Sequence, residues 1–399
     1  MVDTTGTILP NDLNVSEKFC AAPFSGVLIE PDGGLRPCCD FIGGESTTEY
    51  IYVKEYDRWW NQGLDQLRKS MISGPPDGGC GHCLAKEDNP KETHQRKITN
   101  FRVVNSLGTI LQDYGAGKVD SPSWVEIRLG NVCNLGCIMC DPSLSSMLAT
   151  ERYQHQAKFA DIDIPLGKVN PAPWWKDPDS WETALSLIRQ ARFLNLSGGE
   201  PFMHPKIFDL LGVVSSRCER LSANTNLTLL DQPILDALAA SPAKKLLMIG
   251  SLEGIGAHND YVRYPSKWSV IADNLTALKK ICQIQINHTL QHTSVYTLPA
   301  LLDWSHTQGL PISFGRVYQR SVDRTGMITQ NSVSPVDHER FSNWLAGYNG
   351  PYKEVTEKWA QTYRFDINLH QRFRRYVQTL DSIRGTDFNA TFQPTWIEP

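Results

Sequence analysis

Three closely spaced cysteines carry the strongest chemical signal in the chain. Cys133, Cys137 and Cys140 form a CxxxCxxC pattern just after the apolar run 124–129. Three thiolates on one short loop can bind three irons of a cubane 4Fe–4S cluster and leave the fourth iron open. A zinc site would favour four ligands with paired CxxC spacing, and a redox pair would favour a single CxxC at a helix start. The pattern therefore favours an iron–sulfur cluster with one open iron.

The remaining cysteines form two groups. Cys218 and Cys282 stand alone where a helix is expected to run into an apolar strand, as is typical of buried core cysteines. The opening residues lack the basic and apolar segments of a secretory signal, so we expect a cytoplasmic protein without a disulfide scaffold. Cysteines in such a compartment are often metal ligands, redox groups or core residues. Those in the first 83 residues are Cys20, Cys38, Cys39, Cys80 and Cys83.

A second motif predicts where a ligand could meet the fold. FLNLSGGEPF at 193–202 predicts a strand that ends in a Gly-Gly turn, whose glycines would let a ligand approach the backbone. Glu200 ends that turn, and its carboxylate can accept hydrogen bonds from a bound ammonium. The runs 246–254 and 284–291 repeat the order of apolar strand, polar end and following helix. This alternation predicts a parallel sheet or α/β barrel with its chemistry at the carboxyl ends of the strands.

The order of these motifs resembles that of the radical S-adenosylmethionine enzymes over roughly residues 123–318. CxxxCxxC is followed by SGGEP at 197–201, SANTN at 222–226, and SLEG and YVR within 251–263. The resemblance implies a partial (β/α)6 TIM-like barrel whose three cysteines bind a 4Fe–4S cluster. The open iron would be chelated by the amine and carboxylate of S-adenosyl-L-methionine.

The same resemblance assigns cofactor contacts to the strand ends. The SGGE turn would hold the amino group, and the later strand ends would reach the ribose and the carboxylate. Two positions depart from the family's usual residues, because Met139 replaces a common aromatic residue and Glu253 stands where aspartate is frequent. Met139 can still pack on the adenine as a soft, apolar side chain. The assigned residues are Met139, Gly198, Gly199, Glu200, Asn224, Asn226, Ser251, Glu253 and Arg263.

The N-terminal cysteines resemble those of a SPASM or twitch subdomain, which binds an auxiliary iron–sulfur cluster. Here they precede the barrel, as in a group of twitch radical enzymes with the reversed order. Spacing from Gly33 selects Cys38 over Cys39, although the next glycine selects Cys39 by the same count. A zinc ribbon is the alternative, because paired cysteine knuckles also suit zinc. The expected ligands of an auxiliary 4Fe–4S cluster are Cys20, Cys38, Cys80 and Cys83.

Composition and pattern divide the chain into three parts. Its 399 residues, 41% apolar and 21% charged, are typical of a globular protein, and a net charge of −4 gives no bulk attraction to nucleic acid or anionic membranes. We expect an N-terminal twitch/SPASM-like iron–sulfur domain at 1–118, a barrel at 119–325 and a helical C-terminal cap at 326–399. Strand residues that could face the barrel lumen are Glu126, Arg128, Asn195, Asn287 and Arg316. The arginines and aromatic residues of the cap, such as Arg372 and Trp359, are expected to be packed or solvated helix faces.

The resemblance implies reductive cleavage of S-adenosylmethionine to a 5′-deoxyadenosyl radical that abstracts a substrate hydrogen. The first hypothesis is modification of a ribosomally synthesised precursor peptide by epimerisation, crosslinking or backbone excision, because many SPASM and twitch enzymes act on peptides. A separate leader-recognition protein is then expected, since no leader-binding domain is evident before Cys20. An electron donor such as flavodoxin or ferredoxin is also expected. The alternatives are a radical dehydrogenase or epimerase of a small sugar, cyclitol or amino acid, and a non-catalytic metal-binding adaptor. No catalytic acid or base is assigned.

Overall fold

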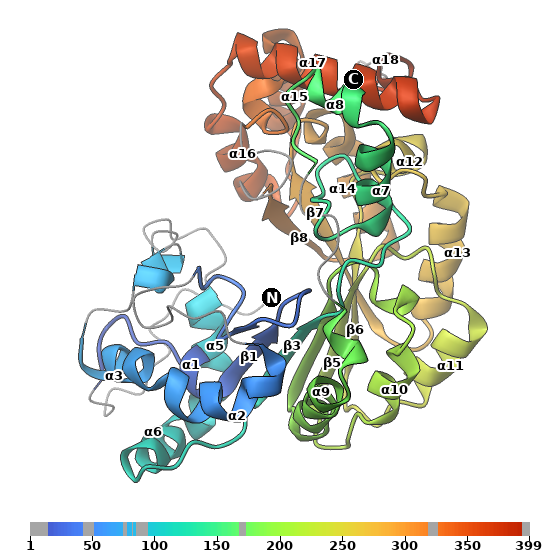
Figure 1. The fold of residues 1–399 in the computed structure, drawn as a ribbon. Coiled ribbons are helices and arrows are strands. Elements are labelled where there is room, and N and C mark those ends of the chain that lie inside the picture. Colours follow the sequence, from blue (N-terminus) through green and yellow to red (C-terminus); the bar gives the residue numbers. More distant parts are fainter. Residues whose placement is uncertain are drawn as a thin grey trace.

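One mostly parallel sheet organises the molecule (Figure 1). The computed structural model describes residues 15–42, 52–74, 78–81, 83–84, 95–166, 173–317 and 326–392. Eight strands follow the order β2-β1-β3-β4-β5-β6-β7-β8, so β2 and β8 are edges and the barrel is open. The strands are β1 (Gly26–Ile29), β2 (Leu35–Arg36), β3 (Trp124–Arg128), β4 (Phe193–Ser197), β5 (Arg220–Thr225), β6 (Leu246–Ser251), β7 (Gln283–Leu290) and β8 (Ile312–Arg316).

Strands β3 to β8 are all parallel to their neighbours and follow one another along the chain, which confirms the predicted partial (β/α)6 barrel. Helices connect them, and several begin at clear signals: Asp177 accepts a hydrogen bond from the Ser180 amide, with Pro178 as the first helical residue. The connecting helices are α7 (Ser146–Gln154), α8 (Gln156–Ala160), η5 (Trp174–Lys176), α9 (Pro178–Gln190), η6 (Pro201–Met203), α10 (Ile207–Gly212), α11 (Gln232–Ala239), α12 (Ala257–Val262), α13 (Trp268–Leu278) and α14 (Ser294–Gln308).

The N-terminal segment extends the barrel sheet. Strand β1 forms an antiparallel hairpin with β2, and β1 also pairs in parallel with β3, which places Leu28 beside Glu126. Trp59 and Trp60 lie in the same apolar core as the barrel strands. The boundary expected at residue 118 lies between α6 and β3. The helices of this segment are α1 (Ala22–Ser25), η1 (Val53–Glu55), α2 (Tyr56–Arg58), η2 (Trp59–Gly63), α3 (Asp65–Ser73), η3 (Gly78–Cys80), α5 (Gln95–Val103), η4 (Val104–Ser106) and α6 (Leu107–Gly115).

The C-terminal segment is helical, as expected, and Ser334 caps its first long helix by accepting a hydrogen bond from the Asp337 amide. The boundary expected at 325 borders residues 318–325, which lie outside the described ranges, as does the side chain of Arg316. Figure 1 shows these helices over the end of the barrel near α7 and α8. Among the described residues, no helix combines the length and apolar character needed to cross a membrane. The elements are η7 (Gln330–Ser332), α15 (Pro335–Gly347), α16 (Lys353–Gln361), α17 (Ile367–Arg384) and α18 (Phe388–Thr391).

Candidate functional site

The barrel sheet presents an apolar face to its helices and a polar face to the inside. Val125 and Leu194 pack in the helix-covered core, whereas the residues that follow them point to the opposite face. Glu126, Asn195 and Ser222 lie side by side on β3, β4 and β5, and the Ser222 hydroxyl donates to Asn195 Oδ1 at 2.9 Å. Polar residues expected in the lumen therefore occupy the inner face where the structure describes them.

The three cysteines lie on the loop that follows β3. The Cys133 amide donates to Ser146 Oγ at 3.1 Å, and the Cys140 amide donates to the Cys137 carbonyl at 3.1 Å, so the loop is held on itself and on α7. Burial raises the pKa of Cys133 to about 12 and raises the pKa of Cys137 and Cys140, and charges on neighbouring cysteines raise those of Cys133 and Cys140 further. Metal binding requires thiolates, so iron must displace these protons.

The Gly-Gly turn after β4 is in close contact with this loop. Gly198 and Gly199 have φ angles of +78° and +56°, a backbone conformation that residues other than glycine rarely adopt. A Cβ on Gly199 would collide with the Val132 carbonyl oxygen and lie 3.0 Å from the Asn131 carbonyl carbon. The Glu200 amide donates to that same Val132 oxygen at 2.8 Å. The glycines thus allow two loops of the site to meet, a role that the sequence interpretation did not include.

The Glu200 carboxylate joins the turn to the end of β5. It accepts hydrogen bonds from the Asn226 amide at 2.7 Å, Thr225 Oγ1 at 2.9 Å and the Phe202 amide at 3.3 Å. Burial raises the pKa of Glu200 to about 7 despite these donors. The Asn226 side chain in turn donates to Asn134 Oδ1 at 2.9 Å, which ties β5 to the cysteine loop.

A buried ion pair reaches the same loop from the opposite side. Arg263 Nη2 donates to Glu253 Oε1 at 2.7 Å, and Nη1 lies 3.8 Å from Cys137 Sγ. Glu253 is fully buried and also accepts from the Thr289 amide and from Gln291 Nε2. The Nε of Arg263 is buried without a hydrogen-bond partner. A cationic donor without a partner beside Cys137 fits an anionic group of a bound cofactor.

The other predicted contacts lie at strand ends or in the core. Asn224 aligns with Ile249 near the end of β5, and Ser251 ends β6 opposite Asn287. Met139 is half-buried and packs against the apolar cluster formed partly by α17. Of the predicted cofactor residues, the structure therefore brings Glu200, Asn226 and the Glu253–Arg263 pair to the cysteine loop by direct or shared hydrogen bonds.

The N-terminal thiols come from three separate places in the chain. Burial raises the pKa of Cys38, and the charges of Cys20, Cys80 and Cys83 raise it further. Burial also raises the pKa of Cys39, and the largest charged influence on Cys39 is Glu126 of the barrel sheet, followed by Cys38. The assignment of Cys20, Cys38, Cys80 and Cys83 as ligands stays a prediction.

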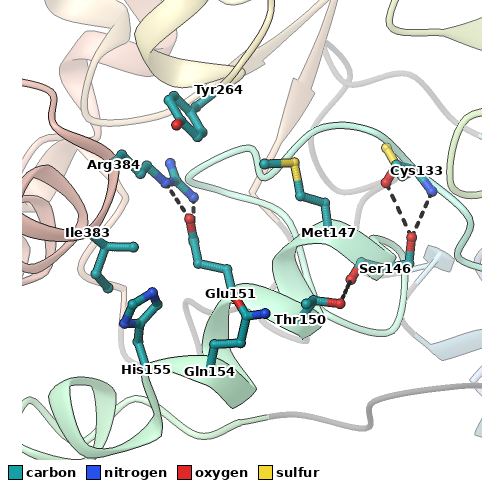
Figure 2. A pocket seen from close by; sticks show the side chains of 10 residues that line it. All are labelled: Cys133, Ser146, Met147, Thr150, Glu151, Gln154, His155, Tyr264, Ile383 and Arg384. Carbon is teal, nitrogen blue, oxygen red and sulfur yellow. Dashed lines mark hydrogen bonds and ion pairs between the residues drawn. The ribbon is translucent and has the colours of Figure 1, made fainter.

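A surface pocket of about 410 Å³ adjoins the cysteine loop (Figure 2). Cys133 and Ser146 lie at one end of it, and Arg384, paired with Glu151, lies at the other. Within the described ranges, no three His, Cys, Asp or Glu side chains converge on a point for a single metal ion. A cubane takes one thiolate on each of several irons, so its ligands surround the cluster and need not converge on one point.

Comparison with known proteins gives one clear relative. No family model matches the chain. The chain is 25% identical over 231 residues to the AdoMet-dependent heme synthase of Methanosarcina barkeri, covering 57% of this chain and 58% of that protein. The matched protein depends on S-adenosylmethionine, which agrees with the order of the motifs that meet at one edge of the sheet. Over this span the chain is similar to a protein that depends on S-adenosylmethionine.

Solved structures resemble the chain more distantly. Streptococcus suis SuiB bound to its precursor peptide SuiA has 13% identity and a TM-score of 0.37, covering 93% of this chain and 78% of that chain. Native anSMEcpe with bound AdoMet has 14% identity and a TM-score of 0.37, covering 56% and 62%. Scores below 0.5 do not establish a common fold.

The sequence did not indicate several residues of the candidate site. Asn134 and Ser146 hold the cysteine loop locally, and a serine shortly after the motif is a signal too common to use. Arg384 and Tyr376 reach the same loop from the C-terminal helix. Their contacts span more than two hundred residues, so no local pattern could have indicated them.

Proposed function

We propose that this protein is an enzyme that cleaves S-adenosylmethionine reductively and takes a hydrogen atom from its substrate. One observation carries the proposal: the cysteine loop, the buried Glu200 carboxylate and the Arg263 guanidinium meet at the carboxyl edge of a parallel sheet. Bound there, the cluster and its cofactor would supply the radical chemistry, and the protein supplies binding, orientation and exclusion of water.

The chain's own residues divide the binding task. Cys133, Cys137 and Cys140 would hold three irons, and Glu200 has acceptor capacity left for an ammonium beyond its three internal donors. Arg263, oriented by Glu253, has its Nε available for the cofactor carboxylate. The remaining proposed contacts are the Gly198–Gly199 backbone for the amino group, Asn224, Asn226 and Ser251 for the ribose, and Met139 for the adenine.

A second, auxiliary 4Fe–4S cluster is proposed on Cys20, Cys38, Cys80 and Cys83. The mutual electrostatic influence of these thiols supports the set, and the different surroundings of Cys39 support its exclusion. Because β1 is hydrogen-bonded to β3, this cluster would belong to the same rigid sheet as the radical site.

The proposed substrate is a ribosomally synthesised precursor peptide, modified by epimerisation, crosslinking or backbone excision. The resemblance of the N-terminal cysteine set to SPASM and twitch subdomains supports this choice. A leader-recognition protein and a flavodoxin or ferredoxin would be its partners. A small molecule is the second candidate, because the matched heme synthase is named for a product that is not a peptide.

Anaerobic reconstitution tests the proposal. About eight irons per chain are expected for two cubanes, and dithionite with S-adenosylmethionine should give 5′-deoxyadenosine. Zinc in place of the N-terminal iron would remove the auxiliary cluster from the account. A short peptide encoded beside the gene should accelerate 5′-deoxyadenosine formation and gain a mass change, whereas acceleration only by sugars or free amino acids would select the small-molecule candidate.

A further inference from the structure

The C-terminal helix α17 binds the cysteine loop on both sides of Cys137. Arg384 Nη2 donates to the Gly136 carbonyl at 2.7 Å, and the Tyr376 hydroxyl donates to the Ile138 carbonyl at 2.9 Å. Both side chains are almost completely buried. Two peptide groups that flank a proposed iron ligand are therefore oriented by a helix more than two hundred residues away.

The amide sides of the same two residues are held by the chain after α12. The Gly136 amide donates to the Tyr264 carbonyl at 2.7 Å, and the Ile138 amide donates to the Val262 carbonyl at 3.0 Å. Arg263, between those two acceptors, is the residue that contacts Cys137 Sγ. The backbone around Cys137 is thus fixed from both sides, and α17 supplies one of them.

Arg384 is itself held rigidly. Its Nε and Nη2 donate to the two oxygens of Glu151 on α7 at 2.8 and 2.7 Å, the paired geometry seen in Figure 2. Its guanidinium carbon lies 4.9 Å from the centre of the Tyr264 ring. A Cβ on Gly136 would approach Arg384 Nη2 to 3.0 Å, so the glycine in the motif makes room for this donor.

We propose that α17 is part of the radical cluster site, with Arg384 and Tyr376 as positioning residues that act through Cys137. This inference rests on the proposed function and deepens it. Groups that orient metal ligands commonly change metal affinity by about 10- to 100-fold when removed, and the surroundings of cluster sulfurs set their reduction potential. Losing either donor should weaken retention of the radical cluster and shift its potential.

The test compares full-length variants reconstituted anaerobically with iron and sulfide. Arg384→Gln should lose its S-adenosylmethionine-responsive electron paramagnetic resonance signal to an iron chelator about 10-fold faster than the parent chain. Tyr376→Phe, which removes one hydroxyl, should show a smaller effect in the same direction. Arg372→Gln is the matched control, because Arg372 lies on the same helix and pairs with the exposed Asp163 rather than the loop.

A double variant separates positioning from folding. Arg384→Gln leaves Glu151 buried without its partner, which is destabilising by itself. Arg384→Met/Glu151→Leu removes both charges, so its thermal stability should return toward that of the parent while fast cluster loss and a shifted reduction potential persist. Recovery of cluster retention together with stability would show that Arg384 is only structural and overturn the inference. A parent chain without any S-adenosylmethionine-responsive signal would instead defeat the proposed function.

Discussion

The two cysteine sites of this protein are built in different ways. In the barrel, all three thiols come from one eight-residue segment whose backbone is hydrogen-bonded to the end of α12 and to α17. The preceding residue, Val132, accepts a hydrogen bond from the turn after β4. In the N-terminal segment, the four proposed ligands come from three places in the chain: before α1, after β2, and around η3. The barrel cysteines therefore lie on one continuous loop that the surrounding hydrogen bonds hold in place, whereas the N-terminal cysteines belong to segments that are distant in sequence.

Neighbouring charges act on the thiols of both sites. Arg263 and Arg384 lower the pKa of Cys137 against the effect of burial, and Arg96 acts in the same direction on Cys20. Neighbouring thiols raise the pKa of Cys38, as they do for Cys133 and Cys140. A metal that neutralises these thiolates would contribute directly to the stability of the N-terminal segment, since metal binding and folding are coupled where segments converge.

The largest expected effect separates the sites by activity. Cys133→Ala should reduce formation of 5′-deoxyadenosine to background, because one iron of the proposed radical cluster loses its ligand. Cys38→Ala should retain reductive cleavage with dithionite. Chromatography of the anaerobic reaction gives the measurement. Cleavage that survives in Cys133→Ala would contradict the radical assignment, and equal loss in both variants would erase the distinction between the sites.

Metal content should separate Cys38 from its neighbour. Cys38→Ala is expected to lose about four irons per chain and to lower the midpoint of thermal unfolding, whereas Cys39→Ala should retain both. Iron analysis and circular dichroism provide the measurements. The reverse pattern would make Cys39 the ligand.

The arrangement of the barrel site should depend on its buried ion pair even without metal. Glu253→Gln leaves Arg263 as an uncompensated buried cation, which should cost about 3 kcal/mol in the free energy of unfolding. Glu182→Gln, which breaks the exposed pair with Arg189, should cost less than about 1 kcal/mol. Urea unfolding of the metal-free chain compares them. Equal costs would show that the pair does not organise the site.

The last prediction is a pH dependence of stability that arises from Glu200. Its pKa is about 7 in the folded chain against an ordinary value of 4.5, so the folded state binds more protons between these values. Stability should therefore fall by about 3 kcal/mol as pH rises from 4.5 to 7 and change little above that. Glu200→Gln should remove most of this slope in urea unfolding of the metal-free chain. If the pH dependence of stability were unchanged in Glu200→Gln, a group other than Glu200 would be responsible for it.

Sequence predicted the parts of the molecule whose signals are local or ordered. The cysteine motif, the SGGE turn and the positions of Glu253 and Arg263 follow from motif order, and strand alternation predicted the parallel barrel. The ion pair between Glu253 and Arg263 was not predicted. The pairing of β1 with β3 was not predicted either, because a hairpin turn specifies its own two strands and says nothing of a third. The contacts of Arg384 with the cysteine loop were also not predicted, since they depend on α17 packing against α7 and not on spacing along the chain.

The central claim is that Cys133, Cys137 and Cys140 hold a cluster with an open iron, separate from the N-terminal thiols. Electron paramagnetic resonance of the dithionite-reduced chain, with and without S-adenosylmethionine, tests it most directly. The account predicts a signal that changes when S-adenosylmethionine is added, is absent in Cys133→Ala and persists in Cys38→Ala. A spectrum that does not respond to S-adenosylmethionine in the fully reconstituted parent chain would contradict it.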